Sequence, residues 1–186
     1  MDSKLQIISG QFKGRKLRLP MGARPTQNRA RIALFNMLDA GIIEDGNSLV
    51  VWDAFAGSGA FGFECLSRWP GAKVVLTDVA PSSLKTIRDN LAMLAVGNRA
   101  TIVHTDAVAG AEKFGANANL IFLDPPYSTP GLGRSLVARL GKVARPGTIL
   151  IWEQEVGNDV IPDEKIWSVL RDKTYGRARF LILERK

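Results

Sequence analysis

Apolar residues follow two alternating patterns along most of the chain. Continuous apolar runs predict buried strands at residues 49–54, 73–77, 100–104, 120–123 and 148–152. Apolar residues at helical spacing lie between these runs, at residues 59–68, 81–94, 107–114 and 133–143. Because strands that alternate with helices form parallel sheets covered on both faces, we expect a doubly wound α/β fold with a mostly parallel sheet. Two last strands, near 165–174 and 179–183, predict a hairpin.

The N-terminal part of the chain does not follow this alternation. Short strands are expected at residues 5–9 and 16–19, joined by a glycine-containing loop as a β-hairpin. The prolines and glycines that follow exclude regular structure until about residue 27. From Asn28, apolar residues at helical spacing predict a helix. We therefore expect a hairpin and linker over residues 1–27, in front of a main domain over residues 28–186.

Charge gives this N-terminal part a predicted function. The chain carries 25 Lys and Arg against 18 Asp and Glu, a formal net charge of +7. Residues 1–31 contain eight basic residues and one acid, whereas the charges of residues 32–186 sum to zero. A basic segment on a neutral body predicts a polyanionic partner such as a nucleic acid. The expected phosphate contacts are Lys13, Arg15, Lys16, Arg18, Arg24, Arg29 and Arg31.

Composition excludes several other classes of protein. The 186 residues, 46% of them apolar, fit a single globular domain. A single cysteine, Cys65, excludes an intrachain disulfide and favours a cytoplasmic location. We expect neither a signal peptide nor a membrane span, because no apolar run has the required length. One cysteine and one histidine cannot build a zinc site, so we expect no metal.

A glycine-rich turn follows the first predicted strand and opens a helix. It reads Asp53-Ala54-Phe55-Ala56-Gly57-Ser58-Gly59-Ala60-Phe61-Gly62. Glycines allow a ligand to approach the backbone, and a helix N-terminus offers free N–H groups. The glycines match the dinucleotide fingerprint, but a carboxylate at Asp53 would repel a pyrophosphate and suits an ammonium group instead. The sequence therefore predicts an amino-acid-like ligand such as the methionine end of S-adenosylmethionine, with an ordinary tight turn as the alternative.

Acids also follow the next two predicted strands. Asp78 ends the second strand, where a carboxylate can bind ribose hydroxyls, and Val79 lies beside it. Asp106 follows the third strand, where its carboxylate suits the exocyclic amine of adenine and the Ala107 N–H suits a ring nitrogen. For both acids the alternative is a cap of the helix that follows.

The tetrapeptide Asp124-Pro125-Pro126-Tyr127 follows the fourth predicted strand. Prolines fix the backbone and lack an N–H, so the Pro125 carbonyl can face a cleft beside the Asp124 carboxylate. Two adjacent acceptors suit an amine, which has two donors, and Tyr127 offers a face on which a base can stack. Holding both N–H groups would direct the nitrogen lone pair towards a methyl donor. The alternative is a strand-to-loop turn with an exposed aromatic side chain.

Together these motifs resemble class I S-adenosylmethionine-dependent methyltransferases that act on exocyclic amines. More closely, the chain resembles the bacterial 16S rRNA (guanine(966)-N(2))-methyltransferase family. That resemblance rests on residues 8–17, 24–26, 34–36 and 66–68, on the glycine-rich turn and on the Asp-Pro-Pro-Tyr tetrapeptide. Asn28 and Ile32 depart from it, because the family usually has acids there. The resemblance implies a seven-stranded Rossmann-like sheet with an antiparallel last strand, and an N-terminal hairpin that meets RNA.

The resulting prediction is an enzyme that methylates guanine N2 in 16S rRNA, as a cytoplasmic monomer acting on small-subunit particles. Its cofactor is S-adenosylmethionine, its product S-adenosylhomocysteine, and no metal takes part. The predicted cofactor-binding residues are Thr26, Asp53, Phe55, Ala56, Gly57, Ser58, Gly59, Asp78, Val79, Asp106 and Ala107. The predicted catalytic residues are Asp124, Pro125, Pro126 and Tyr127.

Two other hypotheses stay open at this point. A DNA adenine-N6 methyltransferase needs the same tetrapeptide, but such enzymes generally insert a target-recognition domain, for which the core from Leu49 to Lys186 leaves no room. A non-catalytic RNA-binding or ribosome-assembly factor on the same scaffold is the second. The intact Asp53, Asp124 and Tyr127 argue against it.

Overall fold

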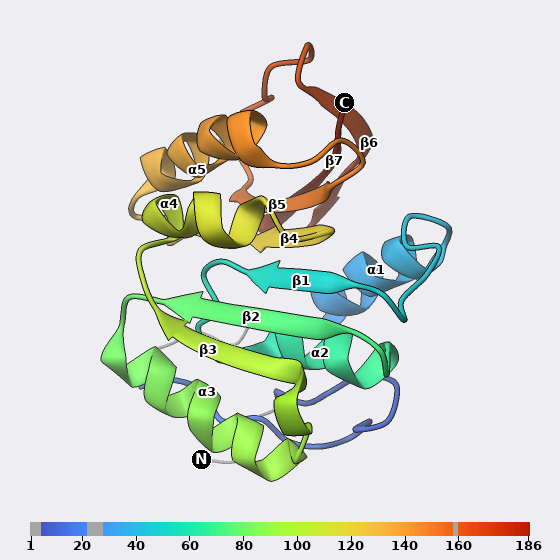
Figure 1. Cartoon of the computed structure of the whole chain (residues 1–186), viewed down its shortest axis with the longest axis vertical. Coiled ribbons are helices and arrows are strands. Elements are labelled where there is room, and N and C mark those ends of the chain that lie inside the picture. Colours follow the sequence, from blue (N-terminus) through green and yellow to red (C-terminus); the bar gives the residue numbers. More distant parts are fainter. Residues whose placement is uncertain (1–4, 22–27, 158–159) are drawn as a thin grey trace.

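The computed structural model describes residues 5–21, 28–157 and 160–186. A seven-stranded sheet runs through the molecule (Figure 1). Its strands are β1 (Val50–Asp53), β2 (Lys73–Asp78), β3 (Ala100–His104), β4 (Leu120–Leu123), β5 (Ile149–Glu155), β6 (Trp167–Tyr175) and β7 (Ala178–Arg185). They lie in the order β3-β2-β1-β4-β5-β7-β6. The first five are parallel and β7 is antiparallel to both neighbours, which confirms the predicted sheet.

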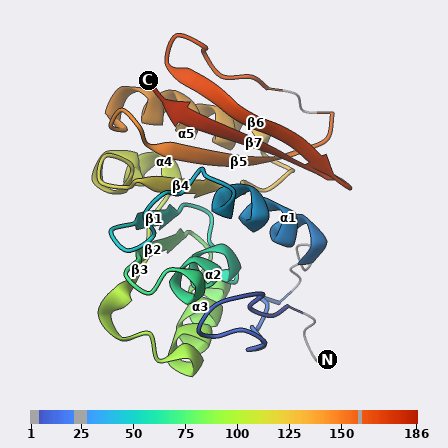
Figure 2. The same ribbon diagram turned by 90° about the vertical axis from the view of Figure 1, so that its right-hand side faces the viewer.

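Helices cover both faces of this sheet, as a doubly wound fold requires (Figure 2). One face carries α1 (Asn28–Asp39), α2 (Ala60–Arg68) and α3 (Pro81–Leu94). The other carries α4 (Ala107–Gly110), the π-helix η2 (Ala111–Gly115) and α5 (Pro130–Val143). A short 3₁₀ helix, η1 (Gly97–Arg99), leads into β3. Within the described ranges, no helix has the length and apolar character needed to cross a membrane.

Most predicted elements are present, and their boundaries differ where tertiary contacts decide them. The strand β5 continues to Glu155 rather than ending at Trp152, because β7 pairs with it as far as Ala178. The helix α5 begins at Pro130, since proline is well suited to a first helical turn. Residues 107–115 form an α-helical turn followed by a π-helix instead of one regular helix.

The N-terminal segment, residues 5–21, forms a hairpin-like loop in which the two expected regular strands do not develop. A single antiparallel bridge joins Gln6 and Lys16. Beyond it the backbone turns onto α2, where the N–H groups of Ile8 and Ser9 donate to the Glu64 carboxylate at 2.7 and 2.9 Å. The expectation of two strands is wrong because the buried Glu64 carboxylate takes the Ser9 N–H, which is the next donor on the side of the chain from which Ile7 bonds to Arg15.

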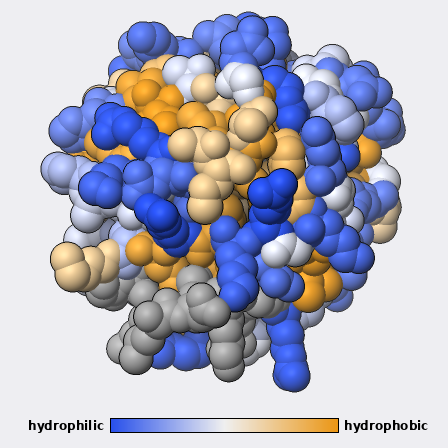
Figure 3. All heavy atoms as spheres, turned by 90° about the horizontal axis from the view of Figure 1, so that it is seen from below, coloured by the Kyte–Doolittle hydropathy of each residue, from blue (hydrophilic) through white to orange (hydrophobic). Residues whose placement is uncertain are grey.

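The same segment belongs to the hydrophobic core. Leu5, Ile7 and Leu17 are almost fully buried and pack in the cluster under α1, α2 and α3. Figure 3 shows the end of the molecule at the bottom of Figure 1, where apolar side chains gather near the middle of the face and hydrophilic ones surround them. The segment is therefore packed against the main body, and the predicted division after residue 27 stays a prediction.

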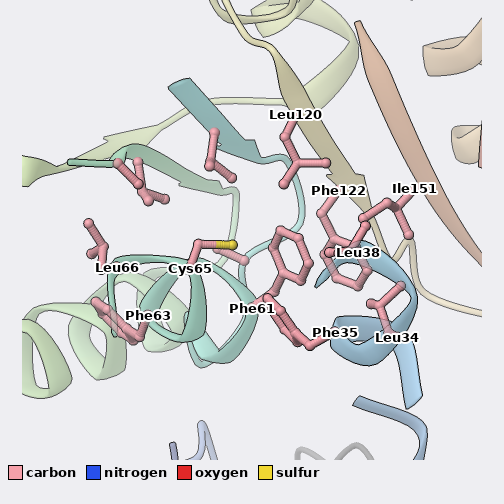
Figure 4. Packing of buried hydrophobic residues seen from close by; sticks show 14 of the residues in the cluster. Leu34, Phe35, Leu38, Phe61, Phe63, Cys65, Leu66, Leu120, Phe122 and Ile151 are labelled. Carbon is pink, nitrogen blue, oxygen red and sulfur yellow. The ribbon is translucent and has the colours of Figure 1, made fainter. Parts of the chain in front are cut away.

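Three stacked phenylalanines connect α1 and α2 to the sheet (Figure 4). The ring of Phe61 lies between those of Phe35 and Phe122, with centroid distances of 5.2 and 4.1 Å. Offset aromatic pairs add to the free energy that burial of their large apolar surfaces already contributes. Phe122 lies on β4, which ends one residue before Asp124, so the stack lies next to the predicted catalytic tetrapeptide.

Gly10 and Gly14 offer a matched test of how the N-terminal segment packs. Both have a positive φ, 80° and 82°. A Cβ at Gly10 would lie 1.9 Å from the Ser67 carbonyl oxygen, whereas a Cβ at Gly14 would meet nothing within 4 Å. Gly14→Ala should lower the free energy of unfolding by about 1–2 kcal/mol through backbone conformation alone. Gly10→Ala should lower it by roughly 2 kcal/mol more, because the segment must move off α2. Urea denaturation measures both, and equal losses would contradict this packing.

Candidate active site

A cavity of about 950 Å³ opens at the carboxyl ends of the parallel strands. It lies where β1 and β4 are neighbours, the point at which the order of the sheet reverses and ligands of such folds bind. Five acidic side chains line it: Asp53, Asp78, Asp106, Asp124 and Glu153. The structure thus brings together the four acids that the sequence indicated, and it adds a fifth, Glu153, that the sequence did not indicate.

Four of these acids point to the same side of the sheet. Side chains two positions apart on a strand share a face. Asp53, Asp78, Asp124 and Glu153 each follow by two positions a buried residue of the core cluster under α1, α2 and α3, namely Val51, Leu76, Phe122 and Ile151. The cavity therefore lies on the face that α1 covers, and residues from α1 form part of its wall.

Asp53 is the most deeply buried of these acids, with 1% of its surface exposed. One carboxyl oxygen accepts from the Gly62 N–H at 3.1 Å. The other, Oδ1, has no hydrogen-bond partner among the described residues. Burial, with smaller effects from Asp124 and Asp78, raises the pKa of Asp53 to about 7. A buried acceptor without a donor fits a cationic ligand group, as the ammonium of S-adenosylmethionine would be.

The conformation of the glycine-rich turn depends on positive φ angles at two glycines and on hydrogen bonds to Asp78. Gly57 and Gly59 have φ of 55° and 79°, and a Cβ at Gly59 would lie 2.4 Å from the Phe63 ring. The Asp78 carboxylate accepts from the N–H groups of Gly57 and Ala80, both at 2.8 Å. Asp78 therefore shapes the turn, and each oxygen keeps a lone pair for a ligand hydroxyl. The cavity wall nearby includes Phe55, Ala56, Ser58 and Val79.

Asp106 caps the helix α4, which is the alternative that the sequence left open for this acid. Its Oδ1 accepts from the Ala109 N–H at 2.9 Å. Asp106 and Ala107 also line the cavity. One oxygen of a carboxylate can cap a helix while the other faces a ligand, so a contact with adenine stays a prediction.

Asp124 and Pro125 present two acceptors to the cavity. Among the described residues, no hydrogen bond occupies the Asp124 carboxyl or the Pro125 carbonyl. Burial raises the pKa of Asp124 to about 7. The Pro126 carbonyl instead accepts from the Thr129 N–H at 2.9 Å and turns the chain towards α5. Tyr127 also lines the cavity, with 37% of its surface exposed.

Glu153 lies beside Asp124 on the neighbouring strand. In the parallel ladder of β4 and β5, Leu123 pairs with Trp152, so the next residues on both strands are adjacent. The Tyr127 hydroxyl donates to Glu153 Oε1 at 3.4 Å. Burial and the charge of Asp124 raise the pKa of Glu153 well above its usual range. Burial and Glu153 in turn raise the pKa of Tyr127, which keeps that hydroxyl a donor. Continuing the strand alternation past Trp152 was the signal that could have found Glu153.

The predicted basic residues do not form one exposed group. Lys13, Arg15, Lys16, Arg18 and Arg29 are exposed. Arg31 is only 4% exposed, donates to the Gln6 carbonyl and lines the cavity. Arg31 is expected from the sequence to contact phosphate, but the structure buries this side chain because α1 packs it against the N-terminal segment. Arg24 and Thr26 lie outside the described residues.

Residues 5–184 match the protein family described as Conserved hypothetical protein 95. The chain belongs to this family. It is 37% identical to Ribosomal RNA small subunit methyltransferase D of Escherichia coli K12, over the whole chain and 92% of that relative. It is 31% identical to the Haemophilus influenzae protein of the same name, over 97% of the chain and 94% of that relative. Membership of the family confirms the resemblance that the motifs gave.

Solved structures share the fold of this chain. The yhhF protein from Escherichia coli matches with a TM-score of 0.81 and 34% identity, over 97% of each chain. An RNA methyltransferase from Salinibacter ruber, solved with S-adenosyl-L-homocysteine, matches with a TM-score of 0.65 and 18% identity, over 86% of this chain and 92% of that one. At 18% identity, the match to the Salinibacter ruber protein shows a shared fold only. Together they confirm the predicted Rossmann-like architecture.

The raised pKa of Asp53 predicts that its ionised carboxylate lowers the free energy of unfolding of the ligand-free protein. A carboxyl whose folded pKa is about 7 holds its proton in the folded protein while the unfolded chain has released it. Its contribution to stability is therefore complete below about pH 4 and is lost as the pH rises through 7. At pH 8, Asp53→Asn should raise the free energy of unfolding of the ligand-free protein by about 2 kcal/mol, roughly 4–8 °C in Tm.

Thermal unfolding at pH 5 and pH 8 measures this effect, and Asp45→Asn is the control, since Asp45 is exposed and its pKa is lowered. The stabilisation by Asp53→Asn should shrink at pH 5. A loss of stability at pH 8 would show that the Asp53 carboxylate is satisfied within the protein.

Proposed function

We propose that the protein is an S-adenosylmethionine-dependent methyltransferase that modifies the N2 amine of a guanine in 16S rRNA. The observation that carries this proposal is the pair of acceptors formed by the Asp124 carboxyl and the Pro125 carbonyl. Both residues line a cavity whose wall also includes Asp53, and one carboxyl oxygen of Asp53 has no hydrogen-bond partner among the described residues. The names of the curated relatives, which are rRNA small subunit methyltransferases, support rRNA as the substrate class.

The cavity wall fits the proposed cofactor part by part. The Asp53 oxygen Oδ1 would accept from the ammonium group, and Asp78 would accept from the ribose hydroxyls. Asp106 and the Ala107 N–H would bind the adenine. When bound, S-adenosylmethionine would supply a methyl group on a positively charged sulfur, so that an amine nitrogen can bond to the methyl carbon while the carbon–sulfur bond breaks and S-adenosylhomocysteine leaves.

The protein's own residues prepare the amine for that transfer. Asp124 and Pro125 would each accept one N–H of the amine, which turns the nitrogen lone pair towards the cofactor side of the cavity. Tyr127 would stack on the base and keep it in place. A carboxyl with a pKa of about 7 can also accept a proton near neutral pH, which makes Asp124 the proposed proton acceptor. The target base must be unpaired or flipped out to reach this cavity.

The exposed basic residues of the N-terminal segment are the proposed RNA contacts, and a buried side chain connects that segment to the glycine-rich turn. Asn90 on α3 accepts from the Arg18 N–H at 2.8 Å and donates to the Ser58 carbonyl at 2.9 Å. RNA bound by the segment would therefore be connected to the cofactor site through Asn90. We also propose that the enzyme is a monomer, that it acts on small-subunit particles, and that it works in the cytoplasm.

The alternatives have less support. The seven strands of the sheet and its helices take up the described chain from Asn28 onward, and none of these elements is a separate target-recognition domain for DNA. A non-catalytic assembly factor has no need for the buried carboxyls of Asp53 and Asp124 in the wall of one cavity, where Asp53 Oδ1 has no partner among the described residues.

Transfer of labelled methyl to 16S rRNA, free and in small-subunit particles, tests the proposed reaction through nucleoside analysis. Label should appear in N2-methylguanine. Asp124→Ala should lower the rate at least ~100-fold, as the loss of a preorganised electrostatic contact does, while calorimetric affinity for S-adenosylmethionine changes little. Glu44→Ala, at an exposed position near the opposite end of β1, is the control and should match the wild type. Label in N6-methyladenine, or in no nucleoside, would contradict the proposal.

Charge reversal tests the RNA contacts of the N-terminal segment. Arg15 and Lys16 are exposed, and Arg15→Glu with Lys16→Glu should weaken binding to 16S rRNA. The slope of log affinity against log salt should become shallower by roughly 1.5, because two phosphate contacts are lost. The same charge change at Lys142 and Lys165, exposed positions on α5 and in the loop before β6, is the control. Equal effects of the two double variants would indicate a general charge effect only.

A further inference from the structure

Glu153 is a buried carboxyl for which the proposed reaction has no function. It is 5% exposed and lines the cavity. The residues that follow it on β5 are engaged elsewhere, since Gln154 bonds to Val160 and Glu155 pairs with Arg177. Among the described residues, the hydrogen bond that Glu153 receives is the long one from Tyr127, at 3.4 Å. Its carboxyl therefore has acceptor capacity that a ligand can use.

The position of Glu153 relative to the amine site follows from strand register. Asp124 and Glu153 are adjacent on parallel strands, whose spacing is about 4.8 Å. On its other side Glu153 pairs with Phe180 on β7, an apolar neighbour that supplies no donor from its side chain. An amine held by Asp124 and Pro125 would thus place the next atoms of its ring within reach of Glu153.

The chemistry of purines makes this third acceptor informative. In guanine the ring nitrogen next to the amine, N1, carries a hydrogen and donates. In adenine the ring nitrogen next to the amine carries a lone pair and accepts. A carboxylate at that place accepts from guanine and repels adenine, and a site built around a specific donor rejects analogues that lack it.

We propose that Glu153 selects guanine by accepting the N1–H of the target base, an inference that rests on the proposed guanine-N2 reaction. Guanine then offers three N–H donors, and Asp124, Pro125 and Glu153 are three acceptors. In the free protein, burial of Glu153 beside Asp124 raises the pKa of its carboxyl. The three N–H donors of guanine would stabilise the ionised carboxylates of Asp124 and Glu153, which burial otherwise disfavours. Adenine has two donors, and its lone pair would face Glu153.

The test compares guanine with 2-aminopurine at the methylated position, in whichever RNA substrate the wild-type enzyme accepts. 2-Aminopurine keeps the reactive amine but has no N1–H. The wild type should favour guanine by about 10- to 100-fold in kcat/KM, the range expected for a lost hydrogen bond to a charged group. Glu153→Gln has an amide that can also donate, so its preference should fall to within about 3-fold. Glu153→Asp keeps the carboxylate and should keep the preference at a lower rate.

The ratio between the two bases separates selection from other functions of Glu153. A general loss of activity in Glu153→Gln with an unchanged ratio would overturn the inference and indicate that Glu153 serves the chemical step or the fold. Calorimetry with S-adenosylmethionine shows whether each variant keeps its cofactor site. A wild-type ratio near one would overturn the inference even if no variant folds. If the wild type methylates no guanine, the proposed function itself fails.

Discussion

The packing of several carboxyl groups at one edge of the sheet is the constraint on which the rest of this structure depends. Parallel strands end together, and alternation directs Asp53, Asp78, Asp124 and Glu153 to one side. Burial raises the pKa of both Asp53 and Asp124 to about 7, so the arrangement opposes the charged state that these groups prefer in water. Such strain is typical of sites whose ligands bring the missing hydrogen-bond donors.

The surrounding elements hold these acids in place against their mutual repulsion. The stack of Phe35, Phe61 and Phe122 fixes α1 and α2 on the sheet below the cavity. The Trp52 indole donates to the Thr77 hydroxyl at 3.0 Å and ties the ends of β1 and β2 together. The glycine-rich turn is bonded to Asp78 and, through Asn90, to the N-terminal segment. The cofactor side of the cavity is therefore stabilised by contacts with the hydrophobic core, with the sheet and with the proposed RNA-binding segment.

The parts of this arrangement that the sequence predicts are those set by local signals. The helix Pro81–Leu94 begins at a proline, and β4 ends where Asp124-Pro125 removes a backbone donor, so both match their predicted bounds. The parts that the sequence does not predict depend on distant partners. The N-terminal strands yield to the Glu64 carboxylate, and Glu153 joins the site because β7 extends β5 by pairing with it. Glu64 is 56 and 55 residues from its two partners in the sequence, so no local pattern could reveal these contacts, whereas the alternation of β5 continued past Trp152 would have indicated Glu153.

The distribution of charge explains how a basic protein can present an acidic cavity to a nucleic acid. The excess positive charge lies in residues 1–31, most of whose described basic side chains are exposed, whereas the cavity wall holds five acids against two arginines, Arg31 and Arg177. A phosphate would be attracted to the exposed basic side chains and repelled from the cavity. A flipped base carries no charge and can offer N–H donors, so it can enter where the backbone cannot. The positive potential of the N-terminal segment would thus bind the RNA backbone. The negative potential of the cavity would exclude phosphate and admit the uncharged base. This separation also favours a base with several donors, which guanine provides on the edge that carries its amine.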